Sequence, residues 1–253
     1  EDLKTRLGNI FIGYSFDKKP IYARDLKAEG AMALLMKDAI KPNLVQTLEG
    51  NPAILHGGPF ANIAQGTNTI IATKMGLSLA DYVVTEAGFG ADLGAEKFLH
   101  IKGHYSGLKP AAYVLVATIR ALRYHGGAKK GEYENPNLHF VEKGIENLKK
   151  HIENAFKFGL KPIVAINHFA TDSDEEINFV KSECEKLGVK AILADEFTKG
   201  GEGMIELAEE VVHCATNCGN DFKPLYNVED TVENKIEIIA NIVAIGSGKI
   251  TLE

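Results

Sequence analysis

Glycines and polar side chains come together in the run HGGPFANIAQG, which begins at His56. It follows an apolar, strand-like segment and leads into a helical pattern. Paired glycines before a helix let backbone amides approach an anion closely, and the helix dipole favours negative charge there. His56, Gly57, Gly58 and Asn62 are therefore candidates for binding a phosphate-like group. A tight strand–helix turn that binds nothing would explain the two glycines equally well.

A second charged run, TEAGFGADLGAEKF, follows residues 82–84, which we expect to form a strand. Ligands gather beyond the carboxyl ends of parallel strands, where this loop would lie. Glu86 and Asp92 could there bind a cation or a magnesium–nucleotide complex, with Lys97 close by in the sequence. The alternative is a solvated loop whose charges pair with one another.

Two glycine patterns depart from the common nucleotide-binding loops. The stretch GFGADLG, from Gly88 to Gly94, has a spacing different from GxGxxG, which disfavours a Rossmann dinucleotide site. The stretch GSGK, from Gly246 to Lys249, is followed by Ile250 and has Val243 where GxxxxGK(S/T) requires glycine. It therefore fails as a phosphate-binding loop.

Two further polar runs, NHFATDSD from Asn167 and DEFTKGGEG from Asp195, each follow a predicted strand. Each has one aromatic residue, Phe169 or Phe197, at a rim where a flat ring could stack. Lys199 and the glycines after it could present a cation and free amides to an anion. A lone phenylalanine is more often a core residue, but matching positions on neighbouring strand ends favour a binding role.

Predicted strands and helices alternate along the chain. Strands are expected at residues 9–14, 82–85, 113–118, 162–167 and 191–194, and helices at 23–39, 60–79, 141–158, 173–187 and 203–216. Ser173 or Asp174 would cap the helix that starts there. This alternation predicts an α/β fold with a mainly parallel sheet and helices on both faces.

A polar loop at residues 126–137 separates a glycine-rich first part from a second part with simpler alternation. We therefore expect a domain boundary near residue 150. It divides the chain into residues 1–150 and 151–253.

Composition excludes several classes of protein. The net charge of −6 argues against nucleic acid as the main partner. The three cysteines, Cys184, Cys214 and Cys218, suit reduced thiols in the cytoplasm better than a disulfide framework. Ordinary thiols also explain Cys214 and Cys218 better than a metal site with His213. Because the start of the sequence is charged and no apolar run approaches ~20 residues, we expect a cytoplasmic protein without a membrane span.

Five stretches carry a resemblance to formate–tetrahydrofolate ligase. They are ARDLKAEGAMALLMKDAIKPNLVQTLEGNPAILHGGPFANIAQGTN, ADYVVTEAGFGADLGAEKF, VATIRALRYHGG, VAINHFATDSD and FTKGGEG. The resemblance covers nearly the whole chain. It implies a ligase that joins formate to tetrahydrofolate through formyl phosphate. Its substrate would be ATP with Mg²⁺, and a monovalent cation could also bind. It also implies a tetrameric parent enzyme, with an incomplete P-loop-NTPase-like part before a second α/β domain that supplies the folate site.

The resemblance also assigns roles to residues. Phe169 and Phe197 would stack on the pterin ring, although the family usually has Trp at the position of Phe197. His168 and Ala170 likewise replace the commoner Arg and Pro. The residues that would contact folate are Asn167, Thr171 and Asp172. Those assigned to catalysis are His56, Gly57, Gly58 and Lys97. Those assigned to nucleotide and phosphate are Asn62, Glu86, Asp92, Lys199, Gly200 and Gly201, and no residue is assigned as a metal ligand.

The family's phosphate-binding loop, of the GEGKTT kind, does not occur in these 253 residues. Without its lysine and hydroxyl, γ-phosphate and Mg²⁺ lose their main protein groups, so we expect the polypeptide alone to be largely inactive. It would then be part of a longer ligase. The alternatives are a non-catalytic module that binds folate or a ligase partner and, less favoured, an unrelated α/β nucleotide-binding regulator.

Overall fold

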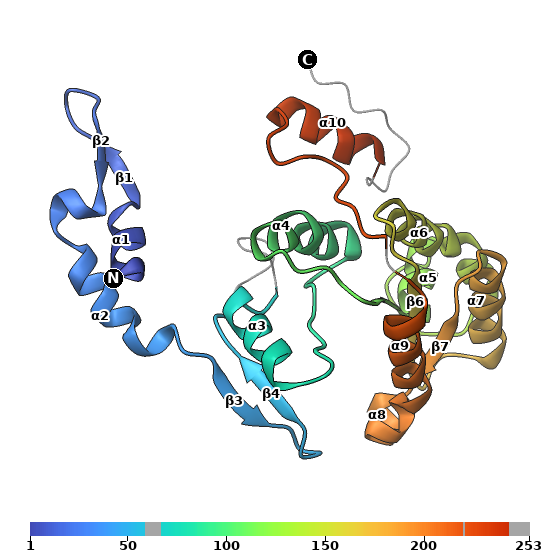
Figure 1. The fold of residues 1–253 in the computed structure, drawn as a ribbon. Helices are drawn as coiled ribbons and strands as arrows, with labels where there is room; N and C mark the ends of the chain where they lie inside the picture. The colour runs from blue at the N-terminus through green and yellow to red at the C-terminus, as the bar shows by residue number, and fades with distance from the viewer. Residues whose placement is uncertain (59–66, 220, 243–253) are drawn as a thin grey trace. The chain divides into compact units, whose positions relative to one another are not determined.

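The computed structural model describes residues 1–58, 67–219 and 221–242 (Figure 1). The chain forms two compact units, Glu1–Glu86 and Ala87–Glu253. Residue 150, near which we expected a domain boundary, lies inside a long helix of the second unit. The assignment of nucleotide and folate roles to the two halves of the chain stays a prediction.

The first unit consists of short helices and two antiparallel strand pairs, β1 with β2 and β3 with β4. Its elements in chain order are α1 (Asp2–Gly8), β1 (Phe11–Tyr14), β2 (Pro20–Tyr22), η1 (Ala23–Leu26), α2 (Glu29–Ala39), β3 (Asn43–Gln46), β4 (Pro52–Leu55) and α3 (Ile70–Leu79).

Three expectations for this unit were wrong. The strand at 9–14 does not join a parallel sheet, because the short turn closed by Ser15 and Lys19 can only connect antiparallel strands. The single helix at 23–39 is two helices, since Lys27 between them has a left-handed backbone with φ of 58°. Residues 82–85 form no strand, because this run pairs with no strand of the described chain.

Two more differences concern β3, β4 and α3. The β3–β4 hairpin was not predicted as a pair, although the segment before His56 was expected to be strand-like. In the described chain, the helix predicted at 60–79 starts only at Ile70, after the cap residue Thr69. Residues 59–66, which include Asn62, lie outside the described residues.

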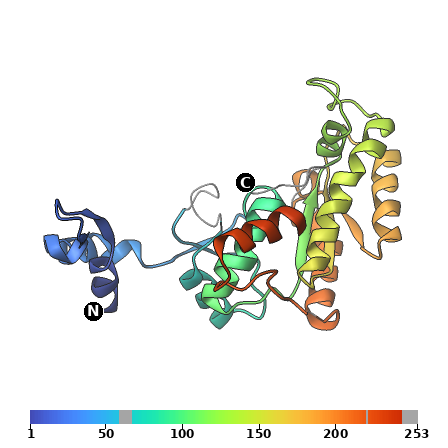
Figure 2. The same ribbon diagram turned by 90° about the horizontal axis from the view of Figure 1, so that it is seen from above.

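The second unit contains the parallel sheet, with strand order β5-β6-β7. Figure 2 shows this sheet with helices on both of its sides. Its elements are η2 (Ala91–Ala95), η3 (Phe98–Lys102), α4 (Gly103–Ser106), β5 (Tyr113–Ala117), α5 (Ile119–His125), α6 (Leu138–Lys157), β6 (Pro162–Asn167), α7 (Asp174–Lys186), β7 (Ala191–Ala194), α8 (Glu196–Lys199), η4 (Gly200–Met204), α9 (Ile205–Asn217) and α10 (Val232–Ile242). The strands predicted at 162–167 and 191–194 are confirmed. The strand predicted at 113–118 and the helices predicted at 141–158, 173–187 and 203–216 are confirmed to within a few residues.

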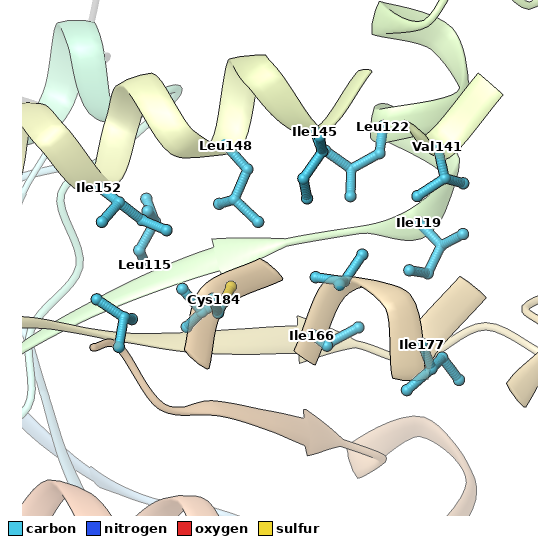
Figure 3. Packing of buried hydrophobic residues seen from close by; sticks show 13 residues of the cluster. Leu115, Ile119, Leu122, Val141, Ile145, Leu148, Ile152, Ile166, Ile177 and Cys184 are labelled. Carbon is cyan, nitrogen blue, oxygen red and sulfur yellow. The ribbon is translucent and has the colours of Figure 1, made fainter. Parts of the chain in front are cut away.

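The central strand β6 shows why this sheet is covered on both faces. Its side chains alternate, so Val164 and Ile166 enter one apolar cluster with α6 and α7, while Ile163 and Ala165 enter another with α9. Figure 3 shows the first cluster, to which α6 contributes apolar side chains at helical spacing, among them Ile145. The predicted α/β architecture is thus confirmed for this unit. A P-loop-like first part stays a prediction.

The beginning of α7 was also predicted from local chemistry. Ser173 Oγ accepts a hydrogen bond from the backbone N–H of Glu176, and the Glu176 carboxylate accepts one from the N–H of Ser173. This reciprocal capping box satisfies amides that the first helical turn leaves without partners. It also draws the Glu176 carboxylate inward, toward the loop that precedes the helix.

No helix in the described part of the chain combines the length and the apolar character that crossing a membrane requires.

Candidate functional site

The loop after β6 is tightened by a reciprocal pair of hydrogen bonds between Phe169 and Asp172. The Phe169 N–H donates to Asp172 Oδ2 at 2.9 Å, and the Asp172 N–H donates to the Phe169 carbonyl at 2.9 Å. The His168 N–H is held by the Ala194 carbonyl at the end of β7. This turn leaves the Phe169 ring 41% exposed at the carboxyl edge of the sheet.

Behind this loop lies Arg123 from α5, which is fully buried. Its guanidinium donates to both carboxylate oxygens of Glu176, from Nε at 2.7 Å and from Nη2 at 2.6 Å. Nη2 also donates to the Thr171 carbonyl at 3.0 Å. No sequence pattern had pointed to Arg123, and none links it to Glu176, because the two residues lie 53 positions apart.

Asp172 points toward this guanidinium and not toward solvent. Its Oδ1 lies 3.6 Å from Arg123 Nη2, and its side chain is fully buried. Burial raises the pKa of Asp172, which the hydrogen bond from the Phe169 amide and the charge of Arg123 oppose. The side chain is therefore placed behind the loop, not on the face where a ligand would sit. Thr171 is exposed, and Asn167 is half-buried at the end of β6.

The loop after β7 is organised by the Asp195 carboxylate. His168 Nδ1 donates to Asp195 Oδ1 at 3.1 Å, and Lys199 Nζ lies 3.1 Å from Asp195 Oδ2. These contacts, with one from Thr198, lower the pKa of Asp195 to about 2. The carboxylate therefore joins the two strand-end loops and balances the charge of Lys199, which we had expected to face an anion.

Glycines are required where the loop after β7 closes. Gly200 has φ of 58°, a left-handed backbone that side chains disfavour. A Cβ on Gly203 would overlap the Asp195 carbonyl oxygen. The closed loop leaves the Phe197 ring on α8 94% exposed. Gly201 lies in the same turn, in η4, and is exposed.

Two exposed phenyl rings thus follow two neighbouring parallel strands, with His168 and Asp195 at the same edge. Exposed aromatic rings at such an edge suit the binding of a flat, partly apolar ring system. The strand-end position of Phe169 and Phe197, predicted from the sequence, is confirmed. Their role in binding stays a prediction.

In the first unit, the His56 side chain is engaged at both ring nitrogens. Nε2 lies 2.9 Å from the Ala39 carbonyl and donates to it, and Nδ1 lies 2.7 Å from the Thr69 hydroxyl oxygen. Thr69 Oγ1 in turn accepts from the Ala72 N–H and caps α3. His56 therefore ties the end of β4 to the start of α3, and a contact with a ligand would have to come from Gly57 and Gly58.

Both of these glycines have positive φ angles, 86° for Gly57 and 125° for Gly58. Glycine adopts such backbone conformations readily, whereas other residues rarely do. The predicted turn after β4 is therefore a real backbone requirement. It is compatible both with anion-binding amides and with a turn that binds nothing.

The charged run from Glu86 to Lys97 spans the division between the two units. Glu86 is exposed and ends the first unit, whereas Asp92 is exposed in η2 and Lys97 is half-buried between η2 and η3. Phe89 has φ of 65° although it is not glycine. A strained backbone of this kind is frequent in functional loops, and no sequence pattern had pointed to Phe89.

Two cavities of the second unit lie away from the predicted residues. One, of about 550 Å³, is lined by His100, His104, Lys109 and Tyr226 among others. His100 is buried, donates from Nδ1 to Glu96 at 2.6 Å and accepts at Nε2 from the Leu225 N–H. The other, of about 490 Å³, is lined in part by Cys214 and Cys218. Within the described residues, no three His, Cys, Asp or Glu side chains group as a metal site.

The model of the family described as formate–tetrahydrofolate ligase matches residues 1–252 of the chain. The match includes both strand-end loops and the turn at His56.

Proposed function

This chain belongs to the formate–tetrahydrofolate ligase family, and we propose that the edge formed by the loops after β6 and β7 is its folate-binding site. The family catalyses the ligation of formate to tetrahydrofolate with ATP as a substrate. The observation that carries the proposal is the pair of exposed rings, Phe169 and Phe197, after neighbouring parallel strands. We assign both rings to stacking on the pterin, with Asn167 and Thr171 at its margin.

We further propose that the turn at His56 binds the phosphoryl group that is transferred in the reaction. In this proposal, ATP phosphorylates formate, and the N10 amine of tetrahydrofolate attacks the formyl phosphate. The backbone amides of Gly57 and Gly58 are candidates to hold the phosphoryl group, since the His56 ring is held by Ala39 and Thr69. Asn62, Glu86, Asp92, Lys97, Lys199, Gly200 and Gly201 remain candidates for nucleotide and phosphate contacts.

We expect the 253 residues alone to have little ligase activity. The sequence has no GxxxxGK(S/T) loop to hold the γ-phosphate and Mg²⁺. A non-catalytic folate-binding module would share the aromatic edge but would not bind ATP. Calorimetric titration with ATP and with folic acid separates these two functions. Product formation by the purified polypeptide would contradict the expected lack of activity.

The pterin assignment is tested by titrating folic acid into the chain and into two variants, Phe169→Ala and Phe197→Ala. We expect each to weaken binding by about tenfold, because stacking on an aromatic ring contributes ~1–3 kcal/mol. Phe197→Trp should tighten binding, since it enlarges the stacking surface.

Phe156→Ala is the matched control, because the Phe156 ring is exposed to a similar extent, 44%, but lies on α6. It should leave the affinity unchanged. Equal affinity in all of these proteins would remove the pterin assignment.

A further inference from the structure

The buried charges behind the loop after β6 form a continuous chain that ends at Phe169. Arg123 holds Glu176 through two hydrogen bonds and the Thr171 carbonyl through a third. Asp172 lies with Oδ1 toward this guanidinium, and its Oδ2 accepts from the Phe169 N–H. A single arginine thus faces both carboxylates that shape the loop.

Stability alone is a poor reason for such a group of buried charges. Removing a guanidinium and two carboxylates from water is costly, and apolar side chains of similar volume often stabilise a fold as well. A planar guanidinium does, however, impose direction, because its N–H groups leave it at fixed angles. Here they point to Glu176 at the start of α7, to Thr171 in the loop and, through Nη1, to the Tyr133 carbonyl at 3.2 Å.

The same chain of contacts sets where the Phe169 backbone can lie. Glu176 accepts from the N–H and the hydroxyl of Ser173, which fixes the end of the loop nearest α7. Asp172 fixes the other end through the Phe169 N–H. Without the guanidinium, two buried carboxylates would face each other, and the turn that presents the Phe169 ring would lose its charge balance.

We propose that Arg123 and Asp172 are positioning residues for the folate site, acting through the Phe169 backbone without touching the ligand. This inference rests on the proposed function. It reassigns Asp172, which the resemblance placed among the folate contacts, to the rear of the loop. Glu176 belongs to the same buried group of charged residues, since it binds Arg123 and caps α7.

The test combines hydrogen exchange of the Phe169 amide with folic acid titration on the full chain. We expect Asp172→Ala to speed exchange of this amide by about tenfold or more, because the amide loses its acceptor. It should weaken folic acid binding to a similar degree. Asp172→Asn keeps an oxygen that can face the Phe169 N–H and should restore much of the protection and of the binding.

Arg123→Lys keeps the positive charge but loses the planar set of N–H donors. We therefore expect faster hydrogen exchange of the Phe169 amide in a chain that remains folded. Arg120→Lys is the matched control on the same helix, where an exposed pair joins Arg120 to Glu134 at 3.1 Å. It should change neither exchange nor affinity. Circular dichroism reports whether each variant is folded, and Asp172→Asn carries the test if Asp172→Ala is not.

The two readouts fail in different ways. If the wild type does not bind folic acid, the proposed function fails, while the exchange data still decide whether Asp172 positions Phe169. If folded Asp172→Ala exchanges the Phe169 amide and binds folic acid like the wild type, the positioning role is overturned. Faster exchange with unchanged affinity would also overturn it, because the loop would then not be coupled to the ligand.

Discussion

The two units of this chain differ in how their apolar side chains are used. In the described part of the second unit, two clusters bury side chains from the sheet and its covering helices, and a third includes Leu99 and Phe158. Ile166 on β6 is 0% exposed. In the described part of residues 1–86, the buried apolar side chains are Ala23 and Ala72. There α2 leaves large side chains in solvent, with Leu35 82% exposed.

The difference between the units lies in side-chain packing and not in local secondary structure. Both units have hydrogen-bonded helices and strands, yet among the described residues the strands that are covered on both faces belong to the second unit. Most helical stability comes from packing an apolar face, so elements without such packing are the ones that open most readily. We therefore place the main cooperative unfolding transition in residues 87–253, which also contain the proposed folate edge.

The largest expected effect comes from opening the core of the second unit. Ile166→Ala should lower the free energy of unfolding by about 2–5 kcal/mol, because it leaves a cavity between β6 and its neighbouring helices. Leu35→Ala in the first unit should change it by less than about 0.5 kcal/mol. Urea denaturation followed by circular dichroism measures both. Similar losses in the two variants would remove the distinction between the units.

A smaller effect, of opposite sign in the two units, is expected from two glycines. A Cβ on Gly144 in α6 would overlap the Leu122 carbonyl oxygen of α5, so Gly144→Ala should cost about 1–3 kcal/mol. Gly30 in α2 has only the flexible end of Lys4 nearby. Gly30→Ala should raise helicity slightly, since alanine favours helix by ~1 kcal/mol over glycine. A stabilised Gly144→Ala would show that α5 and α6 do not approach this closely.

Acid should weaken the second unit through Glu176. Burial would raise the pKa of Glu176, but hydrogen bonds from Arg123, Asn137 and Ser173 outweigh it and lower the pKa to about 2. Because the folded pKa lies below the ordinary 4.5, this stabilisation is complete above pH 4.5 and is lost as pH falls toward 2. Glu176→Gln should reduce this slope of stability against pH.

Some of the slope should remain in Glu176→Gln, because the pKa of Asp195 is also lowered to about 2. Glu134→Gln, which removes an exposed partner of Arg120, is the control and should keep the wild-type slope. Unfolding free energies measured from about pH 6 down to about pH 2, a range that covers the transition, decide this. An unchanged slope in Glu176→Gln would mean that its carboxylate is not held as the structure shows.

The smallest effect is a difference in labelling that leaves stability unchanged. Burial raises the pKa of both Cys184 and Cys214 to about 11, whereas Cys218 is exposed. At pH ~8 a thiol reagent should modify Cys218 first and reach the other two only when the second unit opens. Mass spectrometry of labelled peptides measures the rates, with Cys218→Ser as the control. Equally fast labelling of Cys184 would show that this core opens readily.

Sequence patterns predicted the second unit better than the first. The buried run PIVAIN of β6 and the apolar spacing of α6 are strong periodic signals, and the Ser173 cap is a local one. The segments at 9–14 and 82–85 have similar apolar runs, but the first forms β1 in an antiparallel pair with β2, and the second pairs with no strand of the described chain. The partner of a strand is a tertiary property, so the parallel arrangement expected for the first and the strand expected at the second were both wrong.

The candidate site divides along the same line. The residue pattern alone predicts that aromatic residues follow β6 and β7 and that the chain resembles one ligase family along almost its whole length. The tertiary structure, in contrast, sets which charged and polar groups of that site pair with one another, as Asp172 does with Arg123 and Asp195 does with His168. The reason is physical: burial and charge pairing depend on groups that the fold brings together from distant positions, and local residue patterns do not encode them.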